Sequence, residues 1–252
     1  MILRNSLFGL GAQFALRIVG FLFNVLIIRT LGGEAYGQYN IVIAWAALFS
    51  VIGDLGINQY LAREIAREPK KATELFWDTV VLRFVLAVIA SAITIVGAAT
   101  IGVSQNGYTR EIILGVAIYT SSYFLQAVMA PLSSILIGHE RLDITSTLGV
   151  ITQVLFMVAA GIFLLLGLNF VWVVVASVVT LPIVTYLHYR AVRRNHLGPP
   201  RFKINPGLWF AVIKAGFPFG LVQLALSFSF RIDTVILSGH ISDEQIGWYN
   251  AA

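Results

Sequence analysis

The feature that most restricts the fold of this sequence is a series of long apolar runs separated by short polar segments. Each run reaches about 20 residues, the length that an α-helix needs to cross the hydrocarbon core of a bilayer. Only 12% of the 252 residues are charged and 58% are hydrophobic, whereas soluble domains are about 25% charged. Continuous apolar runs also exclude the alternating strands of a membrane β-barrel. The sequence therefore predicts an all-α, polytopic membrane helix bundle.

The order of these runs predicts seven membrane spans. We expect them at residues 7–28, 39–55, 75–101, 112–137, 147–166 and 170–189, with a seventh beginning near Phe210 or Gly216. Residues 31–38 read as a glycine-rich turn. In residues 57–71 an apolar side chain recurs every four positions, which predicts an amphipathic helix on the membrane surface. We divide the chain into a six-helix lobe (1–189), a basic linker (190–209) and the start of a second lobe (210–252).

The lysines and arginines predict a multi-pass protein of the cell membrane with a cytoplasmic N-terminus, because cytoplasmic segments carry an excess of them. In this orientation the outer connections carry only Arg29 and Arg110. The cytoplasmic segments carry Arg4, Arg63, Arg67, Lys70, Lys71, Arg141, Arg190, Arg193, Arg194, Arg201, Lys203 and Lys214. We expect the cluster at 190–203 to contact anionic membrane lipid, at about 1 kcal/mol per charge. The net charge of +5 therefore needs no nucleic-acid partner.

Two segments of the chain resemble each other. LGGEAYGQYN (31–40) and ISDEQIGWYN (241–250) share Glu, Gly, Tyr and Asn in register, and a shift of 210 residues gives eight identities over 37 positions. Six spans separate the copies, so both run in the same direction, as in the parallel repeats of some transporters. We therefore expect the chain to be the N-terminal portion of a longer transporter.

Polar residues form a stripe on the first span and another on the seventh. The first stripe is Gln13, Arg17, Gly20 and Asn24; the second is Gln223, Ser227, Arg231 and Thr234. Spacings of three and four residues place each set on one helix face. We expect the two stripes to line a shared polar cavity. Gln126 and Gln153 are further candidates for residues that line it. For each amide, hydrogen bonding between helices is an equally good interpretation.

Charged residues inside the spans have two interpretations each. Arg17 lies near the bilayer centre, where a charge usually marks function; it either contacts a substrate phosphate or bonds a neighbouring helix. Arg231 is a second phosphate candidate. Asp233, about 200° away from Arg231 around the helix, is expected to point toward helices of its own lobe and is either an ion-coupling carboxylate or part of an ion pair. Asp54, at a helix end, needs a partner and is a possible gate residue, and Arg83 is expected to extend to the headgroups.

Three segments are similar to a known family. GEAYGQYN (33–40), GDLGINQYLAREIAR (53–67) and PFGLVQLALSFSFRIDTVILSGHISDEQIGWYNAA (218–252) resemble Wzx-type flippases of the multidrug/oligosaccharidyl-lipid/polysaccharide (MOP) exporter superfamily. The resemblance implies two six-helix lobes in a MATE-like V. It also implies transport of a polyprenyl-(pyro)phosphate-linked oligosaccharide to the outer leaflet by alternating access, for polysaccharide or O-antigen-type lipopolysaccharide synthesis. Coupling to H⁺ or Na⁺ and contact with polysaccharide polymerase or assembly proteins follow from it as well.

Other functions remain open at this point. A peptidoglycan-precursor (lipid II) flippase would share the cationic cavity, whereas a MATE-type drug or cation antiporter would need an acidic one. A membrane enzyme of glycan assembly would need a large extramembrane segment, and the longest connection here is about twenty residues. We expect no enzymatic activity, no cofactor and no metal site, because the four histidines lie apart from carboxylates at metal-ligand spacing and no phosphate-binding loop is present.

Overall fold

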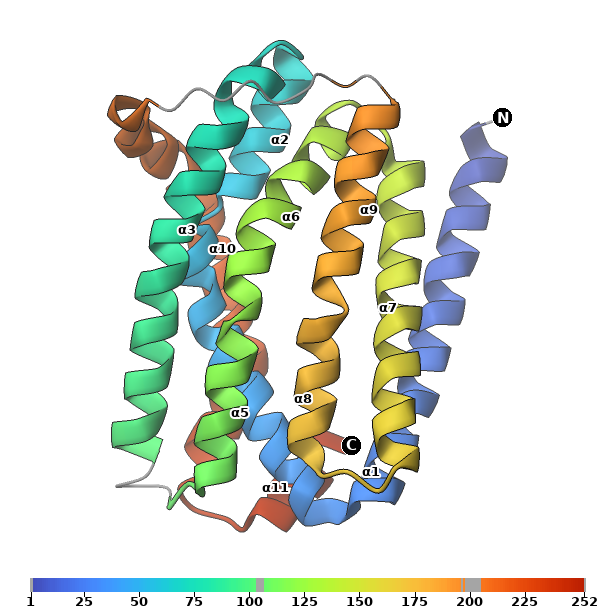
Figure 1. Ribbon diagram of the computed structural model, residues 1–252, viewed down its shortest axis with the longest axis vertical. Helices are drawn as coiled ribbons and strands as arrows, with labels where there is room; N and C mark the ends of the chain where they lie inside the picture. Colours follow the sequence, from blue (N-terminus) through green and yellow to red (C-terminus); the bar gives the residue numbers. More distant parts are fainter. Residues whose placement is uncertain (1, 103–106, 196, 198–204, 252) are drawn as a thin grey trace.

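The structure, a computed structural model, is a bundle of long helices that run along its longest axis (Figure 1). It describes the backbone of residues 2–102, 107–195, 197 and 205–251, and their side chains except those of residues 2–16 and Thr73. No strand occurs in these ranges, and six of their helices are long and apolar enough to cross a membrane. The prediction of an all-α polytopic bundle is therefore confirmed.

The helix α1 (Ile2–Asp54) contains the first two predicted spans. Gly32 interrupts it with φ 82° and ψ 168°, a conformation that residues with a side chain rarely adopt. The chain reverses there, so that α1 has a first arm (residues 2–31) and a second arm (residues 33–54) that run in opposite directions (Figure 1). The predicted turn at 31–38 is too long, because residues 33–38 are already helical.

The remaining helices agree closely with the predicted spans. They are α2 (Ile57–Arg67), α3 (Lys71–Gly97) with the π-helix η1 (Ala98–Gly102), α5 (Arg110–Thr120), α6 (Ser122–Gly138), α7 (Leu142–Leu165), α8 (Phe170–Val179), α9 (Leu181–Arg194), the short η2 (Pro206–Leu208), α10 (Trp209–Leu237) and α11 (Asp243–Ala251). The predicted sixth span is divided at Thr180 into α8 and α9. Pro182 lies in the first turn of α9, where its missing N–H removes no helical hydrogen bond.

The amphipathic segment forms the predicted helix α2, but its apolar face does not lie on lipid. Ile57, Leu61 and Ile65 are at most 1% exposed, because this face packs against α6 and α10. The expected contact of this face with the membrane is therefore wrong. Apolar residues at every fourth position form one apolar helix face. Such a face can be buried against protein or in lipid, and the sequence alone does not distinguish the two.

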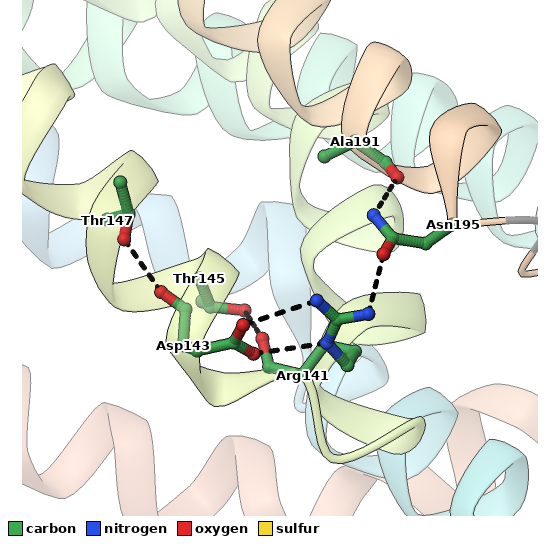
Figure 2. Close-up of polar contacts among 6 residues, drawn as sticks. All are labelled: Arg141, Asp143, Thr145, Thr147, Ala191 and Asn195. Carbon is green, nitrogen blue, oxygen red and sulfur yellow. Dashed lines mark hydrogen bonds and ion pairs between the residues drawn. The ribbon is translucent and has the colours of Figure 1, made fainter. Parts of the chain in front are cut away.

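Most basic residues gather at one end of the bundle, which we call the basic end. It contains α2, the start of α3, the start of α7 and the end of α9, whereas α5 begins and α11 lies at the opposite end (Figure 1). Figure 2 shows how Arg141 joins two of these elements. Its guanidinium bonds Asp143 at 3.1 and 3.2 Å and Asn195 at 2.5 Å, and Asn195 in turn donates to the Ala191 carbonyl at 2.7 Å. These bonds hold the start of α7 to the end of α9.

A second polar cluster at the basic end centres on Glu64 and predicts a pH-dependent stability. Lys71 donates to the Glu64 carboxylate at 2.8 Å, and Arg63 and Arg67 lie 3.6 and 3.7 Å away. The bond from Lys71 and these positive charges hold the pKa of Glu64 below its ordinary value of 4.5. A depressed carboxyl pKa stabilises the folded state above the ordinary pKa, and this contribution is lost as the pH falls through the folded value.

We therefore expect the thermal midpoint of the purified protein to decrease below about pH 4.5, and Glu64→Gln to remove part of that decrease. At neutral pH the same variant should lower the midpoint by about 3 °C. The measurement is thermal unfolding followed by circular dichroism between pH 3 and 7. Glu68→Gln is the matched control, because Glu68 is exposed and lies 3.6 Å from Lys71. Equal curves for Glu64→Gln and the parent would contradict the assignment.

Candidate functional site

An open pocket of about 500 Å³ lies between the first arm of α1 and α7. Arg17, Gly20 and Asn24 line it from α1, and Gly149 and Gln153 line it from α7. Seven residues make about two helical turns, so Arg17 and Asn24 lie on one face of the arm, as the stripe predicts. Phe21 completes the lining. For Gln13, the remaining member of the stripe, the structure describes the backbone but not the side chain.

Arg17 gives this pocket its positive charge. It lies 15 residues before the Gly32 kink, or about 22 Å along the arm, which is near the middle of a span. Its side chain is exposed and has no carboxylate within 4 Å among the described residues. A guanidinium at such depth needs water, an anion or a carbonyl of a neighbouring helix as its partner. Its fork of N–H donors fits a phosphate, and the amides of Asn24 and Gln153 offer donors and acceptors to sugar hydroxyls.

The polar residues of α10 lie outside this pocket. Gln223 is exposed and accepts a hydrogen bond of 3.2 Å from Gln59 of α2. Arg231 is half-buried. The structure thus brings Arg17 and Asn24 together but places Gln223 and Arg231 elsewhere. The partner of the α1 stripe is α7, which supplies Gln153.

Asp233 faces the helix α11 of its own repeat, as its angular distance from Arg231 predicts. One carboxylate oxygen accepts from the Thr234 amide at 2.7 Å, and the other accepts from the Tyr249 hydroxyl. The adjacent Thr234 hydroxyl bonds Asn250 of α11 at 3.2 Å. Asp233 forms no ion pair with any described residue. Its carboxylate is therefore held by neutral donors.

Asp54 has a partner that the sequence did not reveal. Its carboxylate forms an ion pair with Arg83 of α3, and the two side chains are 14% and 6% exposed. The expectation that Arg83 extends to the headgroups is therefore wrong, because the arginine points inward to Asp54. Asn58 and Arg63, the neighbours of Asp54 in sequence, do not bond its carboxylate in the described structure. The pair links the end of the second arm of α1 to the middle of α3.

Removing one member of this pair should destabilise the bundle strongly. We expect Asp54→Ala to lower the stability by about 3–5 kcal/mol, because it leaves a buried guanidinium without its counter-charge. The double variant Asp54→Leu/Arg83→Met should recover most of this loss, since apolar pairs of similar volume replace buried ion pairs at little cost. Thermal unfolding in detergent measures both. A double variant as unstable as Asp54→Ala would show that the pairing is not the cause.

The two copies of the repeat meet at the opposite end of the bundle. A Cβ placed on Gly37 would lie 1.8 Å from the Asp243 carbonyl oxygen, and one on Gly247 would lie 2.1 Å from the Gly33 carbonyl oxygen. Gly37 corresponds to Gly247, and Gly33 to Asp243, under the shift of 210 residues. Each copy therefore contacts the other through the same two positions, as surfaces related by a two-fold axis do. We call this the repeat contact.

Hydrogen bonds and apolar packing reinforce the repeat contact. Gln38 donates to Asp243 at 3.0 Å, and the Tyr108 hydroxyl lies 2.5 Å from the Ser238 hydroxyl and accepts from Trp45 at 2.8 Å. Ile246 of α11 is buried in the same apolar cluster as Trp45. At the basic end, by contrast, the first arm of α1 and the start of α10 lie at opposite edges of the view (Figure 1). The two copies are thus joined at one end and separated at the other.

The histidines take no part in a metal site among the described residues. The Nδ1 atoms of His139, His188 and His240 each lie 2.8–2.9 Å from the carbonyl oxygen four residues earlier, and His196 lies outside the described residues. No group of three or more His, Cys, Asp or Glu in the described ranges is placed to hold a metal ion.

One comparison with known proteins identifies the family. Neither a curated protein nor a solved structure matches the chain. The family described as polysaccharide biosynthesis protein matches residues 2–252, a range that includes the pocket and both copies of the repeat. The family resemblance that the sequence motifs indicate is thereby confirmed. The chain is a multi-pass membrane protein that belongs to the polysaccharide biosynthesis protein family.

Proposed function

We propose that this chain is the first lobe of a flippase that moves a polyprenyl-(pyro)phosphate-linked oligosaccharide from the cytoplasmic to the outer leaflet. The observation that carries the proposal is Arg17, a cation without a described counter-charge, in an open pocket at mid-span depth. The phosphate of the lipid carrier would supply the missing negative charge. The amides of Asn24 and Gln153 would bond the sugar. Family membership sets the biosynthetic context, which is polysaccharide synthesis.

The arrangement of the two repeat copies supports alternating access. We assign the basic end to the cytoplasm, since cytoplasmic segments are enriched in lysine and arginine. The repeat contact then closes the outer end, while the first arm of α1 and the start of α10 stand apart on the cytoplasmic side (Figure 1). Substrate would enter from the cytoplasm and leave after the repeat contact opens. Asp233 is our candidate for H⁺ or Na⁺ coupling, and Asp54 for the cytoplasmic gate.

The charges favour an anionic substrate over a cationic drug. Asp54 is already paired with Arg83, and Asp233 accepts from Tyr249. Arg17 and Arg231 have no carboxylate within 4 Å among the described residues. A site for cations would need carboxylates without a cationic partner rather than arginines without a carboxylate. We therefore place the function in transport of a phosphate-bearing lipid rather than in drug export or in enzymatic catalysis.

A second lobe would complete the pocket. The repeat predicts one, and the first arm of α1 exposes a row of large apolar side chains beside the pocket: Ile18, Val19, Phe21, Leu22 and Leu26, which are 47–61% exposed. By the repeat symmetry, helices of that lobe would pack on the first arm as the Leu55–Gly56 turn packs on Gly216 and Gly220 of α10. We expect polysaccharide polymerase or assembly proteins to act on the product at the outer face.

A genetic rescue tests this function. The chain, expressed with the second lobe that the repeat predicts, is introduced into three bacterial strains: one without its polysaccharide flippase, one depleted of its lipid II flippase and one sensitive to cationic drugs. We expect surface polysaccharide to return in the first strain only. Growth of the second strain would assign the chain to peptidoglycan precursors. Drug resistance of the third, without rescue of the first, would contradict the proposal.

A further inference from the structure

A second concavity of about 410 Å³ lies between α3, α6 and α9, and the proposed transport does not use it. Its floor includes Phe76 and Leu132, which are 3% and 1% exposed, and its rim includes Tyr186 and Tyr189, which are 58% and 42% exposed. The other lining residues are Trp77, Leu125, Val128, Pro182 and Thr185. We call this concavity the α9 groove. Its lining is almost entirely apolar and aromatic, which suits a hydrocarbon chain.

The α9 groove opens on an apolar outer surface of the bundle. Figure 1 looks onto α3, α6 and α9, with α10 behind α3 and α6. On two of the helices that form the groove, Ile183 of α9 is 51% exposed and Val88 of α3 is 56% exposed, as expected for side chains in contact with acyl chains. Trp77 lies within about two turns of the start of α3, and Tyr186 and Tyr189 lie within about two turns of the end of α9. Both helix ends belong to the basic end, where aromatic residues mark the boundary between hydrocarbon and headgroups.

One face of α9 connects the groove to positive charge. Pro182, Tyr186, Tyr189 and Arg193 follow a 4-3-4 spacing, which places them on a single face. The Arg193 guanidinium lies 6.0 Å from the centroid of the Tyr189 ring, within the range of a cation–π contact. Arg190 lies one turn beyond Tyr186 on the same side of the helix. The groove therefore leads directly to two arginines.

These arginines are available to a ligand. Arg190, Arg193 and Arg194 are exposed and form no ion pair with any described residue. Arg141, at the same end, differs because Asp143 neutralises it (Figure 2). Two carboxylates of α3 flank the groove residues of that helix: Asp78 is buried and accepts from the backbone amide of Asn205, whereas Glu74, in the first turn, is exposed. The net charge at the mouth of the groove is positive.

We propose that the α9 groove binds one anionic phospholipid from the leaflet at the basic end. Its phosphate contacts Arg190 and Arg193, and one acyl chain lies in the groove between α6 and α9. Guanidinium groups bind phosphate through paired N–H donors, and basic pockets between membrane helices select anionic headgroups. Pro182 to Tyr189 spans about 10 Å of helix. This length suits part of one acyl chain better than a long polyprenyl chain.

Native mass spectrometry of the delipidated full chain tests the proposal. Phosphatidylglycerol and phosphatidylcholine with identical acyl chains are added separately. We expect one phosphatidylglycerol molecule to bind roughly 30-fold more tightly than phosphatidylcholine, since two arginines each favour an anionic lipid. Arg190→Gln/Arg193→Gln should remove this preference. Val128→Trp should fill the groove and remove tight binding of both lipids, and Tyr186→Ala, at an exposed rim position, should weaken it several-fold.

Two matched controls accompany these variants. Arg110→Gln removes an exposed arginine at the opposite end, and Ile162→Trp adds an indole to the exposed surface of α7; both should bind as the parent does. Equal affinity of the parent for the two lipids would overturn the proposal. So would unchanged binding by both Val128→Trp and Tyr186→Ala. Displacement of phosphatidylglycerol by polyprenyl phosphate at equal concentration would assign the groove to the transport substrate and reject a phospholipid site.

Discussion

Gly37→Ala is expected to prevent the two repeat copies from meeting at the outer end. The added Cβ would lie 1.8 Å from the Asp243 carbonyl oxygen, and because this atom belongs to the backbone, α11 must move away as a whole. Overpacking of this kind costs about 1–3 kcal/mol, which corresponds to roughly 5- to 150-fold in the population of the closed contact. Gly247→Ala should have the same effect, since its Cβ would lie 2.1 Å from the Gly33 carbonyl oxygen.

Cross-linking measures this population. The chain contains no cysteine, so Gln38→Cys/Asp243→Cys introduces a single pair that a short bis-maleimide can join when the contact is closed. We expect efficient cross-linking in the otherwise unchanged chain and at least a fivefold lower initial rate with Gly37→Ala. Gly53→Ala is the matched control, because it lies in the same helix and a Cβ there meets nothing within 4 Å. Equal rates for Gly37→Ala and Gly53→Ala would refute the repeat contact.

Arg17→Ala is expected to abolish the rescue of surface polysaccharide while leaving the amount of protein in the membrane unchanged. The variant removes the cation of the pocket, but it breaks no ion pair among the described residues. Arg29→Ala, in the same arm and also exposed, is the matched control and should rescue fully. Arg17→Lys separates two explanations: retained activity indicates that charge suffices, whereas loss indicates paired hydrogen bonds to phosphate.

Local patterns of the sequence predicted the helices and part of the site. Apolar runs locate the spans because transfer of the whole segment into lipid, rather than any specific contact, determines them. Residues on one helix can be placed relative to each other from the helical period alone. This is why Arg17 and Asn24 were correctly placed on one face, and why Asp233 was correctly directed toward its own repeat.

Contacts between helices were not predictable in the same way, because they depend on how each helix is rotated and tilted. Arg83 was expected at the headgroups, but it lies 29 residues from Asp54 in sequence and turns inward to pair with it. The second wall of the pocket was expected from α10, with Gln126 and Gln153 as further candidates, and among these it is Gln153 of α7 that lines the pocket. Glycines at 31–38 suggested a turn, yet Gly37 lies in a helix and permits its close approach to α11.

The contact between the two copies of the repeat was only partly predictable from the sequence. Matching glycines at positions 37 and 247 were visible in the alignment of the two copies, and they were interpreted only as a sign of duplication. In the structure each glycine allows the backbone of the other copy to approach. A glycine that is matched between two parallel repeats is therefore a useful indicator of where the copies touch, since only residues without a side chain permit so close a crossing.

Translocation in reconstituted vesicles tests the central claim most directly. The chain with its second lobe is placed in proteoliposomes that contain a fluorescent polyprenyl-phosphate-linked oligosaccharide, and a membrane-impermeant quencher reports the fraction in the outer leaflet over time. We predict that the parent and Arg29→Ala equilibrate the lipid between leaflets, whereas Arg17→Ala remains at the rate of protein-free vesicles. Translocation by Arg17→Ala at the rate of the parent would contradict the account.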